Sequence, residues 1–211
     1  SAACALAALA FALCAAGQET AAQAADPAAP DSALELRVLT FNMRVGYIPE
    51  GRNGWLFRRP LIGEVVRRSR ADLVGAQECT AFQVAELLAD LPDYRAVGRP
   101  KPGSELAGIM NPIFYRADAL EPVARGVFWL SDEPDVAGSK GWGNQNPRTA
   151  FWCRFRRRSD GRELVALNTH LDHACDEARA RSGPLIAGRL PGIAAGVPVL
   201  VTGDFNCTQG H

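Results

Sequence analysis

Apolar and polar residues follow one another in a way that predicts strands and helices in alternation. Residues 57–70 place four aliphatic side chains among arginines, at the spacing of an amphipathic helix. Residues 197–203 (VPVLVTG) are apolar throughout, which is typical of a strand buried on both faces. The same reasoning predicts strands at 34–43, 72–77, 112–118, 122–130, 149–158 and 162–171, and helices at 81–91 and 174–190.

Turn residues indicate how some of these elements connect. Ser159-Asp160-Gly161 joins two predicted strands, and an Asp-Gly pair favours a tight hairpin. We expect 112–118 and 122–130 to pair with each other as well. Gly183-Pro184 lies inside the last predicted helix, where proline should break or kink it. Helices interleaved with hairpins predict an α/β fold, with mixed or antiparallel sheets packed inside helical layers.

The N-terminal residues differ in character from the rest. Residues 2–16 are an unbroken run of small and apolar residues, shorter than the ~20 needed to span a bilayer. Ala22-Gln23-Ala24 fits the small-residue pattern of a cleavage site. We therefore predict a signal peptide over residues 1–24, a Pro/Ala tether over 25–33, one domain over 34–211, and a secreted or periplasmic protein. A buried Ala-rich helix is the alternative for the leader.

Composition narrows the class of protein. The 211 residues include 23 basic and 23 acidic side chains, and 47% are apolar, which excludes a highly charged disordered chain. The balance of charge also lacks the signature of a strongly basic nucleic-acid-binding domain. In an oxidising compartment, the four cysteines after the leader allow up to two disulfides in three full pairings. These cysteines are Cys79, Cys153, Cys175 and Cys207.

Polar side chains follow the apolar strands directly, at the strand ends where α/β proteins usually build their sites. A carboxylate in such a place is costly to bury unless it is paired or bound to a metal, and Glu78 and Asp204 both fit this description. The polar residues at these ends are Asn42, Glu78, Asn168, His170, Asp172, Asp204 and Asn206.

This set of side chains predicts a particular chemistry. Carboxylate and amide oxygens suit Mg²⁺ or Mn²⁺, and a nearby histidine can stabilise or protonate a departing oxygen. Together they can hydrolyse a phosphate ester. Each residue also has an ordinary interpretation: Asn42 as a turn former, Glu78 as a helix-start residue and His170 as a structural histidine. Their shared position at strand ends favours the site.

Six short segments follow one another along the chain: LRVLTFNMR (36–44), GAQE (75–78), NPIFYR (111–116), PRTAFW (147–152), NTHLDH (168–173) and TGDFN (202–206). Their order resembles that of the endonuclease/exonuclease/phosphatase superfamily, a group of metal-dependent phosphoesterases that includes deoxyribonucleases and sphingomyelinases. The resemblance runs from about residue 34 to the end. It implies a four-layer α/β sandwich, in which two mixed β-sheets pack face to face with helices outside.

The resemblance also implies roles for individual residues. Asn42 and Glu78 belong to the metal site, which takes Mg²⁺, with Mn²⁺ or Ca²⁺ as alternatives. His170 contacts the scissile phosphate or leaving group, Asp204 orients the attacking water, and Asn206 is its phosphate-binding partner. The remaining two residues, Arg148 and Asp172, are expected to bind substrate.

Two departures from the family pattern affect these expectations. Relatives carry Gly-Glu shortly before the NPIFYR strand, and that acid assists the catalytic histidine. The aligned pair in this chain is Gly108-Ile109, and isoleucine accepts no hydrogen bond. The family also ends with a further strand that bears an Asp-His pair, and no such strand follows the TGDFN segment before His211. We therefore expect the last strands of the fold to lie beyond this chain, and the chain alone to be impaired.

The substrate remains open between several phosphate esters. A lipid phosphodiesterase of the sphingomyelinase type is the alternative within enzymes, and a non-catalytic binding module on the same scaffold is the alternative outside them. Nucleic acid is a further candidate, but the arginine run at residues 154–158 is more typical of a solvated strand edge than of a phosphate track. No protein partner is implied, and we expect a monomer. Apolar candidates for lipid contact are Trp55, Leu56, Phe57, Trp129 and Trp142.

Overall fold

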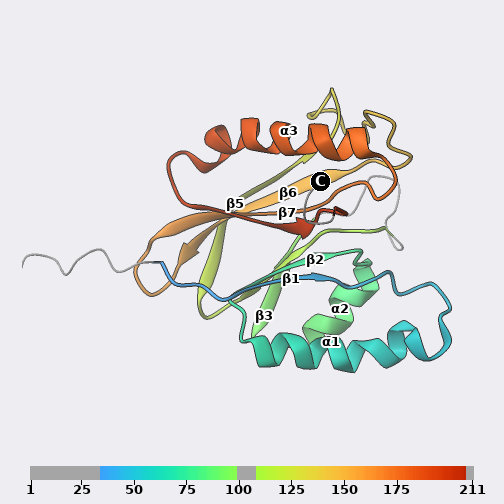
Figure 1. Cartoon of the computed structure of the whole chain (residues 1–211). Coiled ribbons are helices and arrows are strands. Elements are labelled where there is room, and N and C mark those ends of the chain that lie inside the picture. Colours follow the sequence, from blue (N-terminus) through green and yellow to red (C-terminus); the bar gives the residue numbers. More distant parts are fainter. Residues whose placement is uncertain (1–33, 99–107, 208–211) are drawn as a thin grey trace, which may run out of the picture. The chain divides into compact units, whose positions relative to one another are not determined.

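The computed structural model describes residues 34–98 and 108–207, so the predicted signal peptide (1–24) and tether (25–33) lie outside the described residues. A compact unit begins at Leu36. It holds two four-stranded sheets, in the orders β1-β2-β4-β3 and β5-β6-β7-β8. The sheets face each other, with α1 and α2 outside the first and α3 outside the second (Figure 1). This confirms the predicted four-layer α/β sandwich of two mixed sheets.

The first sheet is built from the N-terminal half of the described chain. Strand β1 runs parallel to β2, and β4 lies antiparallel between β2 and β3. Trp55, Ile62 and Val66 of α1 pack against this sheet together with Leu87 of α2. The elements are β1 (Val38–Asn42), the 3-10 turn η1 (Gly51–Asn53), α1 (Trp55–Ser69), β2 (Leu73–Gln77), α2 (Ala81–Asp90), β3 (Tyr94–Val97) and β4 (Ile113–Arg116).

The second sheet is built from the C-terminal half. Strands β5, β6 and β7 are antiparallel, and β8 runs parallel to β7. Ile186 of α3 packs on a core that includes Phe128 and Leu167. No helix in the described part of the chain is long and apolar enough to span a bilayer. The elements are β5 (Leu120–Trp129), β6 (Thr149–Arg157), β7 (Glu163–His170), α3 (Asp176–Ala194) and β8 (Val199–Asp204).

A buried polar seam joins the two sheets. The Gln77 side chain donates to Asn168 Oδ1 at 2.7 Å, and Thr202 Oγ1 donates to the same oxygen at 3.1 Å. Asn168 in turn donates to the Ala76 carbonyl at 2.7 Å. Gly75 makes this approach possible, because a Cβ atom there would lie 2.1 Å from Thr202 Oγ1. The seam therefore fixes β2 against β7 and β8 just before these strands end.

The predicted pairing of 112–118 with 122–130 is wrong. Both edges of β4 are taken, one by β2 and the other by β3, a strand over Tyr94–Val97 that the sequence pattern did not reveal. After a short turn at 117–119 the chain crosses to the other sheet, where β5 pairs with β6. The Asp160-Gly161 hairpin between β6 and β7 is confirmed, with Gly161 at φ +73°.

Two further expectations concern α3 and β8. Helix α3 continues through Pro184 to Ala194, so the break, one of the two effects expected of this proline, does not occur. Pro184 and Ala180, whose carbonyl it cannot bond, are both exposed, so water can satisfy that carbonyl. The strand over 197–203 is not buried on both faces, because Val199 and Val201 are 39% and 37% exposed. Strand β8 is the outer strand of its sheet within the described residues, so it is paired along one edge only.

Candidate active site

Parallel pairing brings the polar strand ends together. Asn42 ends β1 opposite Gln77, the last residue of β2, so Glu78 follows at the same edge of the first sheet. His170 ends β7 directly opposite Asp204, which ends β8. Because β1 lies against β8, the two edges meet across the interface between the sheets. The site therefore takes one half from each sheet.

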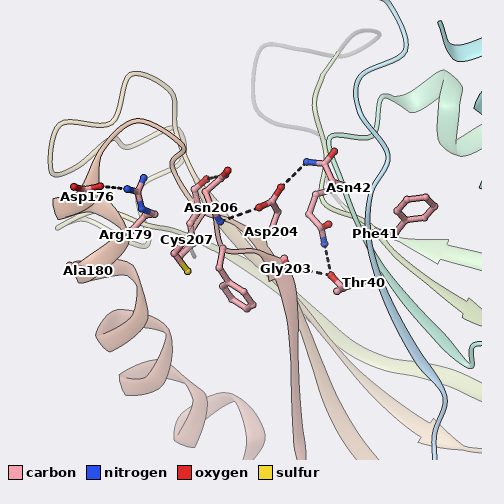
Figure 2. Close-up of a pocket in the computed structure, with 13 residues that line it drawn as sticks. Thr40, Phe41, Asn42, Asp176, Arg179, Ala180, Gly203, Asp204, Asn206 and Cys207 are labelled. Carbon is pink, nitrogen blue, oxygen red and sulfur yellow. Dashed lines mark hydrogen bonds and ion pairs between the residues drawn. The ribbon is translucent and has the colours of Figure 1, made fainter. Parts of the chain in front are cut away.

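Asn42 is the point where the two halves touch. Its side-chain nitrogen donates to Glu78 Oε1 at 3.0 Å and to Asp204 Oδ2 at 2.9 Å. Its oxygen accepts the backbone N–H of Arg44 at 2.9 Å. Figure 2 shows Asp204 reaching from β8 towards this amide on β1. The nitrogen of Asn42, rather than its oxygen, therefore faces both carboxylates.

The backbone at two site residues adopts the left-handed conformation. Glu78 has φ 57° and Asn206 has φ 49°, values that residues with a Cβ adopt rarely and at a cost of about 1–3 kcal/mol. Cys79 holds the first of these turns in place, because it exchanges backbone hydrogen bonds with Met110 in an isolated bridge. Ile109 thus lies beside the Glu78 turn, in the segment where the family glutamate was expected.

Asp204 is held as a carboxylate. Burial raises the pKa of its carboxyl, but the Asn42 amide, the Asn206 N–H, His170 and Arg148 together outweigh burial and lower the pKa below its ordinary value. The Asn206 backbone N–H donates to Asp204 Oδ1 at 3.0 Å. Asp204 therefore stays charged at neutral pH and can accept hydrogen bonds or bind a cation.

His170 and Asn206 complete this half of the site. His170 Nε2 lies 3.9 Å from Asp204 Oδ2, and the histidine is buried. The Asn206 amide nitrogen donates to the Leu171 carbonyl at 3.0 Å, which ties the end of β8 to the residue after His170. The structure thus brings Asn42, Glu78, His170, Asp204 and Asn206 together.

Arg148 and Asp172 form a buried ion pair next to this group. Arg148 Nε lies 3.2 Å from Asp172 Oδ2, and Arg148 Nη2 lies 3.2 Å from His173 Nδ1. Burial raises the pKa of the Asp172 carboxyl. The N–H groups of residues 174 and 175 and the Arg148 guanidinium lower it by more, so the pKa lies below its ordinary value. Asp172 therefore fixes Arg148 in a position where its charge also acts on Asp204.

Arg179 also contacts the Arg148–Asp172 pair, and no motif in the sequence indicated this. Arg179 on α3 donates to the Asp172 carbonyl at 2.7 Å and pairs with Asp176. It also lines a cavity of about 1040 Å³ together with Asn42, Asp204 and Asn206. Figure 2 shows Arg179 projecting from α3 beside the end of β8. In the sequence it is one of several arginines on a helix, and only the return of α3 over β7 places it here.

The donor set fits a hard divalent cation. In the described part of the chain, no group of three or more His, Cys, Asp or Glu side chains is placed to hold a metal by itself. Mg²⁺ does not require such a group, because it commonly binds one or two carboxylates and keeps several waters. Glu78 and Asp204 supply two carboxylates that share one amide donor, so the residues present fit Mg²⁺.

The structure also places the arginine run, the apolar candidates and the cysteines. The arginines of residues 154–158 are paired with acids of the same sheet, Arg154 and Arg156 with Glu163 and Arg158 with Glu121. The expected strand edge is wrong, because β6 is an inner strand paired with both β5 and β7. The ion pairs still argue against a phosphate track, since they occupy the guanidinium groups. Trp55 and Trp129 are buried, whereas Leu56 and Phe57 are exposed. Among the described residues, four cysteines are free, of which Cys79 and Cys153 are buried; the others are Cys175 and Cys207.

Comparison with known proteins adds to this geometry. The sequence profile of the Endonuclease/Exonuclease/phosphatase family matches residues 39–211. A mannosyl-6-phosphatase of Bacteroides thetaiotaomicron is 34% identical with a TM-score of 0.78, over 84% of this chain and 67% of that protein. An endonuclease/exonuclease/phosphatase of Bacteroides vulgatus is 35% identical with a TM-score of 0.79, over 83% of this chain and 67% of that protein.

More distant structures share the fold. The human Nocturnin catalytic domain, with bound sulfate, is 22% identical with a TM-score of 0.67, over 83% of this chain and 65% of that domain. No curated protein sequence matches the chain. This chain spans about two thirds of the length of the two Bacteroides proteins.

Proposed function

Because the chain belongs to the endonuclease/exonuclease/phosphatase family, we propose that its protein is a divalent-metal-dependent phosphoesterase that acts outside the cytoplasm. The observation that carries the activity is the convergence of Glu78 and Asp204 on the Asn42 amide, at 3.0 and 2.9 Å. The leader-like residues 2–16 and the Ala22-Gln23-Ala24 pattern support secretion.

The metal in this proposal is Mg²⁺, with Mn²⁺ or Ca²⁺ as alternatives. Glu78 is its direct ligand, and Asn42 keeps Glu78 and Asp204 in range of each other. When bound, the ion polarises a phosphoryl oxygen and offsets the negative charge that develops during hydrolysis.

The side chains of the chain itself supply the remaining functions. Asp204, charged because its pKa is lowered, accepts a hydrogen bond from the attacking water and orients it. His170 contacts the scissile phosphate or the leaving oxygen, and Asn206 holds the turn that follows Asp204. Arg148, fixed by Asp172, provides a guanidinium for the phosphate oxygens.

Sugar phosphomonoesters are the first substrates to try. The Bacteroides thetaiotaomicron relative, 34% identical over most of this chain, is a mannosyl-6-phosphatase. Phosphodiesters, nucleic acid and sphingomyelin form the comparison set. The paired arginines at 154–158 weaken the argument for nucleic acid, since a phosphate track needs cationic side chains that are available to the backbone.

The full-length protein tests the proposal. Glu78→Gln and Asp204→Asn should each lower kcat/KM at least about a hundredfold, because each removes a charge the reaction needs. The matched control is Glu177→Gln, which changes an exposed acid on α3 paired with Arg181. EDTA should abolish turnover and Mg²⁺ should restore it. Turnover that is indifferent to EDTA and to both site variants would overturn the proposal.

A non-catalytic binding module is the second candidate, and Ile109 favours it, because no acid lies there to assist His170. The two candidates differ in one measurement. A binding module would retain phosphate-ester affinity while showing no turnover on any substrate in the set, with or without Mg²⁺. Ile109→Glu places the family's acid at this position. It should raise turnover if the protein is an enzyme and produce no turnover if the protein is a binding module.

A further inference from the structure

Helix α1 is apolar on both of its sides. Trp55, Ile62 and Val66 are buried against the first sheet. On the outer side, Leu56 is 77% exposed and Leu61 is 67% exposed. A surface helix normally presents polar side chains to water, so large apolar residues that gather on its outer side indicate a surface that meets a partner.

The exposed residues form a continuous stripe. Phe57, Leu61 and Val65 are spaced four residues apart, which places them one above the other on one face of a helix. Phe57 is 54% exposed and Val65 is 43% exposed. We call these three residues, with Leu56, the α1 stripe. In Figure 1 α1 lies on the outer side of the first sheet, so a partner on the stripe leaves the interface between the sheets open.

The surroundings of the stripe are strongly basic. Residues 51–70 contain six arginines and one acid, Glu64, a formal charge of +5. Arg59 is turned towards α2, where it pairs with Asp90 at 2.6 Å. Glu64 is shared between Arg67 and Arg68. The stripe is therefore an apolar strip with an excess of guanidinium groups along it.

This charge decides between the possible occupants. Two copies packed through the stripe would bring their arginine-rich rims against each other, and like charges across an interface are costly. An anionic lipid surface offers the opposite charge together with an apolar interior. Aromatic and aliphatic side chains beside arginines are the composition with which helices lie in a bilayer interface. We infer that the α1 stripe docks on an anionic phospholipid bilayer.

Vesicle sedimentation tests this inference without any substrate, so its outcome does not depend on the proposed hydrolysis. The full chain should sediment with phosphatidylcholine vesicles that contain phosphatidylglycerol and not with phosphatidylcholine alone. Raising the salt concentration should weaken binding, since exposed charges are screened. Phe57→Ser/Leu61→Ser should lower vesicle affinity roughly tenfold or more, because two large apolar side chains no longer enter the interface.

A matched pair of single variants controls for loss of an exposed valine. Val65→Ser should weaken binding, whereas Val136→Ser, 51% exposed in the loop after β5, should leave it unchanged. Circular dichroism and urea midpoints establish that each variant is folded. The inference is overturned if the chain does not sediment with the vesicles, or if wild type and Phe57→Ser/Leu61→Ser bind them equally. It is also overturned if the chain forms a dimer or a protein complex without vesicles and this double variant dissociates it.

Discussion

At the scale of single residues, Asn42 connects the two carboxylates of the site. Each carboxylate accepts one hydrogen from the same amide nitrogen, while the Arg44 N–H holds the amide oxygen on the other side. Two negative groups that share one donor would otherwise repel each other. Asn42 therefore acts on the electrostatics of the site as well as on its geometry.

Replacing Asn42 tests this role. Asn42→Ala removes the largest of the contacts that lower the pKa of Asp204, so the pKa of this carboxyl should rise relative to the wild type. The acid limb of kcat/KM should move to higher pH, and metal affinity should fall about 10–100-fold, as for other residues that orient metal ligands. A pH–rate profile and a Mg²⁺ titration measure both. Asn146→Ala, in an exposed loop, should change neither.

Asp172 gives a second prediction, on stability. Asp172→Asn leaves the buried Arg148 without its counter-ion and should lower the free energy of unfolding at pH 7 by about 3 kcal/mol. A carboxyl with a lowered folded pKa stabilises the fold above its unfolded pKa of about 3.9, and this contribution is lost as pH falls through the folded pKa. Urea unfolding should therefore show the gap between variant and wild type closing below about pH 4.

The matched control for Asp172 lies four residues away. Asp176→Asn changes an exposed acid that pairs with Arg179 on α3. Exposed ion pairs contribute about 0–1 kcal/mol, so this variant should stay near wild type at every pH. A gap for Asp172→Asn that stays constant down to pH 3 would contradict the lowered pKa.

At the scale of elements, α3 tolerates residues that usually end helices. Gly183, Gly188 and Gly192 lie within it, and a Cβ atom at any of the three would meet nothing within 4 Å. Gly188→Ala should therefore raise the free energy of unfolding by about 0.5–1 kcal/mol, because alanine loses less backbone freedom on folding. Thermal unfolding measures this. A loss of stability would mean that another surface covers this face of α3 in solution.

The sequence predicted the elements better than it predicted their partners. Periodicity located α1, α2 and most strands, because it reports which side of an element is apolar. It could not show that β5 leaves β4 for the other sheet, because pairing depends on which edges are already taken. Short β3 was missed because four residues carry little periodicity. Val199 and Val201 were misjudged because neighbours outside the strand decide their burial.

The sequence predicted which polar residues lie together better than it predicted their contacts. Polar residues directly after apolar strands, in the order of a known family, predicted one shared site for Asn42, Glu78, His170 and Asp204, and the structure brings these side chains together. The sequence could not show that the Asn42 nitrogen, and not its oxygen, faces the carboxylates. Nor could it reveal Arg179, because its approach to Asp172 depends on how α3 returns over the sheet.

At the scale of the whole molecule, the site exists only while the two sheets keep their relative position. Glu78 belongs to the first sheet and Asp204 to the second, and the buried seam of Gln77, Asn168 and Thr202 lies directly beneath them. The seam is polar and fully enclosed, so its hydrogen bonds favour one register of the sheets over others. A small shift at the seam should therefore reach the proposed metal site without touching Glu78 or Asp204.

Gly75→Ala tests this coupling. The added Cβ would lie 2.1 Å from Thr202 Oγ1 and 2.8 Å from Asn168 Oδ1, so either β2 or the side chains of the seam must shift. We expect the free energy of unfolding to fall by about 1–3 kcal/mol, as for other overpacked interiors. We also expect weaker Mg²⁺ binding by calorimetry, although Gly75 contacts neither carboxylate. A variant that loses stability but binds Mg²⁺ with unchanged affinity would show that each sheet supports its half of the site independently.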